Sequence, residues 1–149
     1  MKKLPDEVQA FVSLHNLATI ATISSENDYP YVLPIYFVTD DSFKIYFASH
    51  RDGRKLRNII SHPHIGMSIT SPDNLKSLQL QGTATVAEQS PAIVEKIIEV
   101  ANEKSEHSMP PIMKIERGAM LVVTFTIHWY RLANYTEQKA VFIEGKLEG

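Results

Sequence analysis

A run of basic residues lies where a predicted strand passes into a short predicted helix. Arg54 and Lys55 fall in the first turn of that helix, two and three residues after Asp52, its expected cap. A helix N-terminus carries about half a positive charge, so each cation placed there costs about 0.3 to 1 kcal/mol. A bound anion would remove this conflict, because backbone N–H groups and both cations would converge on it. The residues therefore indicate a phosphate-sized site, unless Asp52 neutralises the turn and the basic side chains are simply solvated.

The composition excludes several other kinds of chemistry. The 149 residues contain no cysteine, which rules out disulfides, thiolate catalysis and cysteine-ligated zinc. A net charge of −2 does not favour nucleic acid as a partner. No apolar run approaches the length of a membrane span, and the N-terminus does not resemble a signal peptide. We therefore expect a cytoplasmic protein with no nucleic-acid or membrane partner.

The periodicity of apolar residues predicts the elements that position these side chains. Alternation with period two favours six strands, and a spacing of three to four residues favours three helices. The expected strands are 17–23, 31–38, 43–48, 65–70, 75–87 and 120–132, and the expected helices are 5–15, 54–61 and 91–104. Short connections favour an antiparallel sheet closed into a small barrel, since closure removes exposed edges. We expect a single domain, 1–149, in which 134–149 is a C-terminal extension and 140–143 forms a strand or packs on a neighbouring subunit.

The short basic helix is expected to be amphipathic. Its spacing places Leu56, Ile59 and Ile60 toward the core. Asn58 is expected to face away from the core with the two basic residues of the first turn. The helix should end before Pro63, because the residue before a proline disfavours helical backbone.

Three motifs resemble those of a known family. They are residues 30–35, Pro-Tyr-Val-Leu-Pro-Ile; residues 46–49, Tyr-Phe-Ala-Ser, followed by Gly-Arg-Lys at 53–55 and His-Pro at 62–63; and residues 80–84, Leu-Gln-Gly-Thr-Ala. Their order and spacing resemble the pyridoxamine 5′-phosphate oxidase-like family of FMN-binding split barrels, from the first helix to about residue 132. The resemblance implies a mainly β (α+β) fold, a six-stranded antiparallel split β-barrel with a few flanking helices. It also implies a homodimer with FMN in clefts between the subunits.

The resemblance also assigns cofactor-binding residues. It assigns Arg54 and Lys55 of the short helix as ligands of the FMN phosphate, which agrees with the electrostatic argument above. It places a hydroxyl contact at the end of the third strand, strand contacts along the ring system in the second strand, and a further cofactor position in the fifth strand. The residues assigned are Arg54, Lys55, Ser49, Leu33, Pro34, Ile35 and Ser77.

Several positions depart from true pyridoxamine phosphate oxidases. Leu33 stands where those enzymes have arginine, Val38 where they have a substrate-binding lysine, and Ser77 near the place of a glutamine. Residues 130–135, Tyr-Arg-Leu-Ala-Asn-Tyr, stand in place of the arginine-rich closing motif of those enzymes, with Tyr135 where arginine is expected. Residues 91–104 lack the tyrosine and arginine pair that binds the substrate phosphate in those enzymes. The resemblance therefore implies an FMN-dependent oxidoreductase acting on another small molecule, with its catalytic residues unknown.

Other interpretations remain open at this stage. A non-catalytic flavin binder or sensor would share these motifs, and a haem- or deazaflavin (F420)-binding member of the same fold would share the barrel. His62 and His64 flank Pro63, but no third ligand is evident, so we expect no metal site. The polar segment 105–117 contains two prolines and is expected to be a loop that covers the cleft or merely connects its neighbours.

Overall fold

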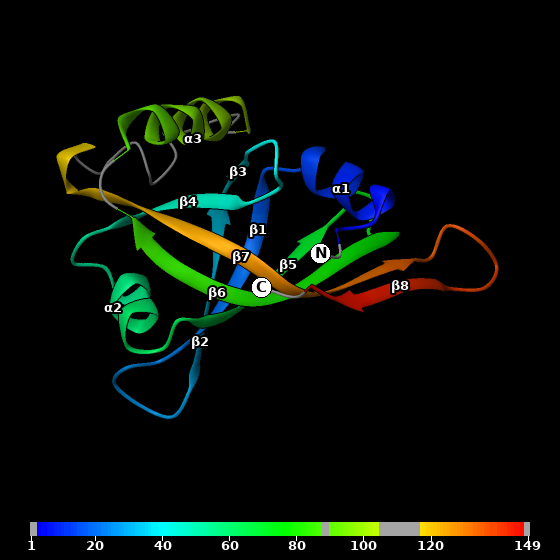
Figure 1. The fold of residues 1–149 in the computed structure, drawn as a ribbon, viewed down its shortest axis with the longest axis horizontal. Helices are drawn as coiled ribbons and strands as arrows, with labels where there is room; N and C mark the ends of the chain where they lie inside the picture. Colours follow the sequence, from blue (N-terminus) through cyan, green and yellow to red (C-terminus); the bar gives the residue numbers. More distant parts are fainter. Residues whose placement is uncertain (1–2, 88–89, 105–116, 148–149) are drawn as a thin grey trace.

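Eight strands form one antiparallel sheet that curls into a split barrel (Figure 1). The computed structural model describes residues 3–87, 90–104 and 117–147. The elements are α1 (Asp6–Ser13), β1 (Leu17–Ile23), β2 (Pro30–Tyr36), β3 (Val38–Thr39), β4 (Ile45–His50), α2 (Arg54–Ser61), β5 (His64–Thr70), β6 (Lys76–Ala87), α3 (Pro91–Lys104), η2 (Arg117–Ala119), β7 (Met120–Asn134) and β8 (Val141–Lys146). The strand order is β2-β1-β5-β6-β7-β4-β3, and β8 also pairs with β7. The sheet thus begins at β2, which leaves the outer edge of that strand outside the ladder.

The longest strands, β6 and β7, bend around a bulge at Gly82. They pair from Lys76, opposite Asn134, to the end of β6, and their register shifts between Gln81 and Gly82. A Cβ atom on Gly82 would lie 2.0 Å from the Thr126 carbonyl oxygen and within 3 Å of the neighbouring phenylalanine ring. Only glycine fits so close an approach, and a bulge adds the local twist that curved sheets need.

Two apolar clusters stabilise the barrel and its flanking helices. The larger one fills the inside of the sheet, where Phe37, Phe47 and Phe125 are fully buried. In the smaller one, apolar side chains of α3, such as Ile97, pack against β4 and the first half of β7 (Figure 1). None of the helices in the described part of the chain is long and apolar enough to span a membrane.

The structure confirms the predicted fold class but corrects the number of strands from six to eight. The second predicted strand is interrupted at Phe37, whose N–H donates to the Asn16 carbonyl at 2.8 Å, while the Asn16 amide donates to the Phe37 carbonyl at 3.1 Å. Residues 38–39 therefore form β3 against β4. The apolar piece of the C-terminal extension forms β8 against β7 of the same chain. The predicted loop 105–117 lies outside the described residues except for Arg117.

Replacing Gly82 by Ala should destabilise the fold. The added methyl group meets backbone that cannot move without disturbing the β6–β7 ladder, so the free energy of unfolding should fall by about 1 to 3 kcal/mol. Gly118→Ala is the matched control, because a Cβ atom there meets nothing within 4 Å. Urea unfolding of the two variants checks this expectation, and equal stabilities would contradict it.

Candidate functional site

A cavity of about 490 Å³ opens between β2, β4 and the start of α2. Its volume lies in the range of roughly 300 to 1,000 Å³ that is usual for small-molecule sites. Most of the wall is apolar, with a few polar groups near α2. The lining residues are Leu17, Leu33, Pro34, Ile35, Tyr36, Ala48, Ser49, His50, Lys55 and Met120.

Five of the seven predicted cofactor residues line this one cavity, namely Leu33, Pro34, Ile35, Ser49 and Lys55. The other lining residues were missed because cross-strand register brings them to the cavity. Pairing of β1 with β2 sets Leu17 opposite Tyr36, and pairing of β4 with β7 sets His50 opposite Met120. The sequence alone does not show which residues of two strands lie opposite each other, so Leu17 and Met120 could be placed at the cavity only once the strand register was known.

Lys55 places a partly buried ammonium group at the cavity wall. Its Nζ donates to the Ala48 carbonyl oxygen at 3.2 Å and lies 5.6 Å from the centre of the Phe47 ring. Burial disfavours the charged form and lowers the pKa of Lys55 to about 8. An ammonium has three donors, and the structure shows one hydrogen bond for it within the described residues. An anion bound in the cavity could therefore accept a hydrogen bond from this ammonium group.

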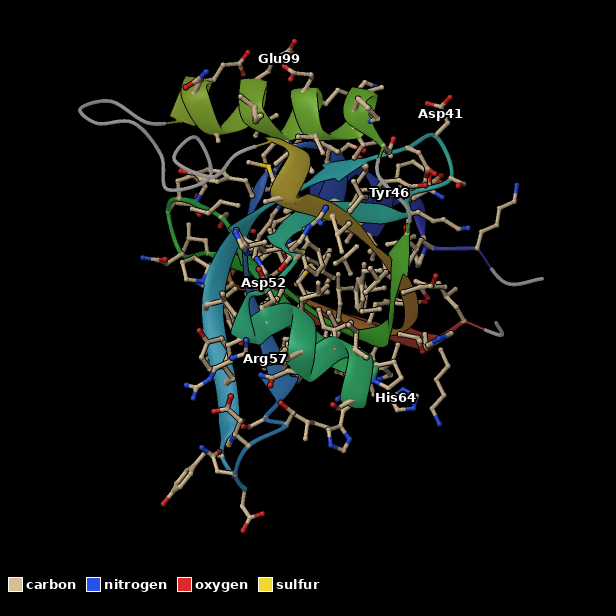
Figure 2. The ribbon with its side chains drawn as sticks, turned by 90° about the vertical axis from the view of Figure 1, so that its left-hand side faces the viewer. Asp41, Tyr46, Asp52, Arg57, His64 and Glu99 are labelled. Atoms are coloured by element: carbon tan, nitrogen blue, oxygen red, sulfur yellow. The ribbon has the colours of Figure 1, made fainter. Side chains whose placement is uncertain are left out.

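The first turn of α2 has no acidic residue and no side-chain cap. Asp52, the expected cap, is exposed, and the N-cap residue is Gly53 with extended backbone, so that prediction was wrong. The Asp52 carbonyl accepts from Arg57, and Figure 2 shows Asp52 just before α2 and Arg57 on it. Because no side chain caps the helix, its first N–H groups keep the positive end of the helix dipole open to an anion.

Arg54 does not line the cavity and instead pairs with the β1–β2 turn. Its guanidinium donates to a carboxylate oxygen of Glu26 at 2.6 Å and lies 5.4 Å from the centre of the Tyr31 ring. Arg57 reaches the other oxygen of Glu26 at 3.3 Å. The hydrogen bond from Arg54 lowers the pKa of Glu26, and the same contact raises the pKa of Arg54. The assignment of Arg54 to a phosphate stays a prediction.

A buried asparagine fixes the turn that carries Glu26. Asn58, which was expected to face away from the core, is fully buried, whereas Ile60, expected inside, is 68% exposed. The Asn58 amide donates to the Thr22 hydroxyl at 2.9 Å, and its carbonyl oxygen accepts from the N–H of Ser25 at 3.0 Å and from the Ser25 hydroxyl. These bonds hold α2 against the β1–β2 turn, so Glu26 stays beside Arg54.

Ser77 lies on β6, opposite Thr70 of β5 and Ala133 of β7, and does not line the cavity. Because paired residues share a face, the register places Ser77 on the outer face of the sheet with Gln79, Ser68 and Thr19. A cofactor contact from Ser77 stays a prediction.

A second cavity of about 520 Å³ lies over the bulge between β6 and β7. Its residues are His64, Ile65, Gly66, Gln81, Gly82, His128 and Trp129. The His128 ring nitrogen Nε2 lies 2.9 Å from the Thr83 hydroxyl and shares a hydrogen bond with it. Across residues 3–87, 90–104 and 117–147, no three histidine or carboxylate side chains are grouped so that they could hold a metal ion.

The sequence matches the profile of a known protein family. The sequence profile described as pyridoxamine 5′-phosphate oxidase matches residues 4–133. The chain belongs to the pyridoxamine 5′-phosphate oxidase family. The match covers every element from α1 to β7, apart from the last residue of β7. No curated protein matches the sequence.

Solved structures share the fold of this family member at low identity. An FMN-binding protein related to pyridoxamine 5′-phosphate oxidase from Nostoc punctiforme PCC 73102 is 11% identical, with 100% of both chains covered and a TM-score of 0.68. An F420 reductase is 18% identical over 85% of this chain and 98% of its own, with a TM-score of 0.69. A Clostridium acetobutylicum protein related to general stress protein 26 is 16% identical over 95% and 92%, with a TM-score of 0.66. These likenesses show the fold.

Replacing Lys55 by Met should stabilise the ligand-free protein near pH 7. The pKa of Lys55 is about 8 in the fold and about 10.4 in an unfolded chain, so the buried charge costs roughly 1 to 3 kcal/mol below pH 8. This cost shrinks as the pH rises from about 8 to 10.4, because the lysine of the unfolded chain then loses its proton as well. Urea unfolding near pH 7 and pH 9.5 should show a gain that shrinks with pH.

The matched control is Lys146→Met, which removes an exposed charge on β8 and should change little at either pH. A Lys55→Met protein that is less stable than the parent near pH 7, or whose gain is the same at both pH values, would contradict the assignment of a desolvated ammonium.

Proposed function

We propose that this protein is a cytoplasmic flavoprotein that binds FMN in the cavity beside α2 and oxidises or reduces a small molecule. The observation that carries the proposal is the ammonium of Lys55 at one end of a largely apolar cavity. FMN has a flat ring system and a charged phosphate, so it needs apolar walls and a local cation together. Bound FMN would supply the electron-transfer chemistry, while the protein binds and orients it.

The residues at the cavity fit the two ends of FMN. Lys55 and the uncapped N–H groups of α2 suit the phosphate, and the Ser49 hydroxyl lies on the same wall. Leu33, Pro34 and Ile35 offer the apolar side for the ring system. Because β2 lies at the edge of the sheet, its free backbone groups are available to the polar rim of the ring.

The charge of the cavity supports a substrate other than pyridoxamine phosphate. Lys55 is the one lysine or arginine among the lining residues, and Leu33 stands in the lining where true oxidases have arginine. Val38, which replaces their substrate-binding lysine, is in β3 and does not line the cavity. One ammonium suits one phosphate, and a phosphorylated substrate would bring a second into the same site.

We also propose that two copies of the chain form the complete site. Leu17, Ile23 and Val32 are about half exposed, and the β1–β2 register places them on one face, next to the cavity. A second copy would cover this apolar surface. Ser77 lies on the same outer face of the curled sheet and would reach a cofactor across the seam between subunits, which gives its predicted role a physical route.

F420 is the second candidate cofactor, because an F420 reductase has the same fold. F420 is a deazaflavin that, like FMN, combines a flat ring system with phosphate, so the residues at α2 would suit either. Separate titrations of the protein with FMN and with F420 distinguish them, and a preference for F420 would replace FMN in the proposal.

FMN should bind more tightly than riboflavin, and Lys55 should account for the difference. Hydrogen bonds to charged groups contribute about 1.5 to 3 kcal/mol, so Lys55→Met should weaken FMN about 10- to 100-fold and leave riboflavin nearly unchanged. Since the pKa of Lys55 is about 8, the affinity for FMN should also fall between about pH 7.5 and pH 9. Fluorescence titration with both ligands measures these effects.

Lys146→Met again serves as the control and should bind both ligands as the parent does. Equal losses for FMN and riboflavin in Lys55→Met would contradict a phosphate contact, and a protein that binds neither ligand would contradict the flavin proposal. Anaerobic bleaching of the flavin bands by a nicotinamide donor then tests the oxidoreductase part, and a cofactor that no donor reduces would indicate a flavin binder.

A charge on the exposed face of β2 should break the proposed dimer. Val32→Lys places an ammonium in the centre of the apolar face, so the variant should be monomeric and should bind FMN more weakly. Val141→Lys is the control, because Val141 is also about half exposed but lies on β8. Analytical ultracentrifugation gives both masses. A parent protein that is monomeric with FMN bound would contradict the shared site.

A further inference from the structure

A backbone hydrogen bond fixes the tautomer of His50, a residue that lines the cavity. The backbone N–H of Asp52 donates to His50 Nδ1 at 3.0 Å. A ring nitrogen that accepts an N–H carries no proton, so the neutral imidazole must carry its proton on Nε2. The Gly53 N–H donates to the His50 carbonyl at 2.9 Å, which closes a tight turn between β4 and α2 and holds the backbone of His50 in place.

The Nε2–H group is available to a ligand. His50 lines the cavity together with Ser49 and Lys55, and it is partly buried opposite Met120. Within residues 3–87, 90–104 and 117–147, the structure shows no acceptor for this Nε2–H group. A Cβ atom at Gly53 would lie 3.1 Å from the His50 carbonyl and 3.6 Å from the Ser49 hydroxyl, so the turn packs closely against both residues.

Arg54 is engaged elsewhere. Its guanidinium is bound to Glu26, and Glu26 is held in place through the Asn58 and Ser25 hydrogen bonds. The side chains of Arg54 and Glu26 are 44% and 45% exposed, and neither residue lines the cavity. Of the two cations in the first turn of α2, one therefore faces the cavity and the other fastens the helix to the β1–β2 turn.

We infer that His50, through Nε2–H, is the second side-chain donor to the phosphate bound by Lys55, and that Arg54 serves to hold the β1–β2 turn. This inference rests on the proposed FMN site and adds His50, which the sequence did not indicate, to the residues that bind the phosphate. A neutral imidazole adds a directed hydrogen bond to an anion without adding a second buried charge.

Three variants separate the roles of the two residues. His50→Gln can keep an amide N–H near the position of Nε2, whereas His50→Asn is too short to reach it. His50→Asn should weaken FMN about tenfold with riboflavin changed less than about twofold, and His50→Gln should stay within about threefold of the parent. Arg54→Gln should change FMN affinity less than about twofold. Fluorescence titration measures all three.

The inference is overturned if His50→Asn binds FMN as the parent does, if His50→Gln loses as much as His50→Asn, or if Arg54→Gln loses as much as His50→Asn. A parent protein that binds neither FMN nor riboflavin overturns the FMN site itself. A second readout does not depend on any ligand: ¹H–¹⁵N correlation spectra of the ligand-free protein should show His50 as the Nε2–H tautomer, and the Nδ1–H tautomer would overturn the inference.

Discussion

The candidate site depends on an ammonium group that burial keeps poorly solvated. Lys55 has one carbonyl as hydrogen-bond partner, an aromatic ring beside it and apolar cavity walls around it. Burial of this kind lowers the pKa of a lysine and makes its charged form costly, unless an anion provides the missing interaction. This poorly solvated ammonium in the cavity lining is the observation on which the proposed phosphate site rests.

The surrounding fold keeps that ammonium in position. The β4–α2 turn begins the helix at Gly53, so Lys55 points back toward the end of β4, where its Nζ meets the Ala48 carbonyl. Asn58 anchors the same helix through a buried hydrogen bond to Thr22 of β1 and through partly buried ones to Ser25 in the β1–β2 turn. Glu26 then neutralises Arg54 outside the cavity, so the helix can carry two adjacent cations without placing both in the site.

Local patterns in the sequence predicted much of this, and long-range contacts account for most of the rest. The bounds of α3 and of β1 follow from periodicity, and the motif around Lys55 led to the cavity. The burial of Asn58 could not be predicted, because its partner Ser25 lies 33 residues away. The sequence also shows the charge of Arg54 but not that Glu26, 28 residues earlier, would attract it. From the sequence alone, a polar residue is expected to be exposed, because a hydrogen-bond or charge partner far along the chain cannot be recognised.

The most direct test of this account is a crystal structure of the protein grown with FMN. We expect the phosphate within about 3 Å of Lys55 Nζ, over the first turn of α2, with the ring system along Leu33, Pro34 and Ile35. A phosphate bound away from Lys55, or a cavity in which Lys55 keeps its bond to Ala48 and no ligand is present, would contradict it.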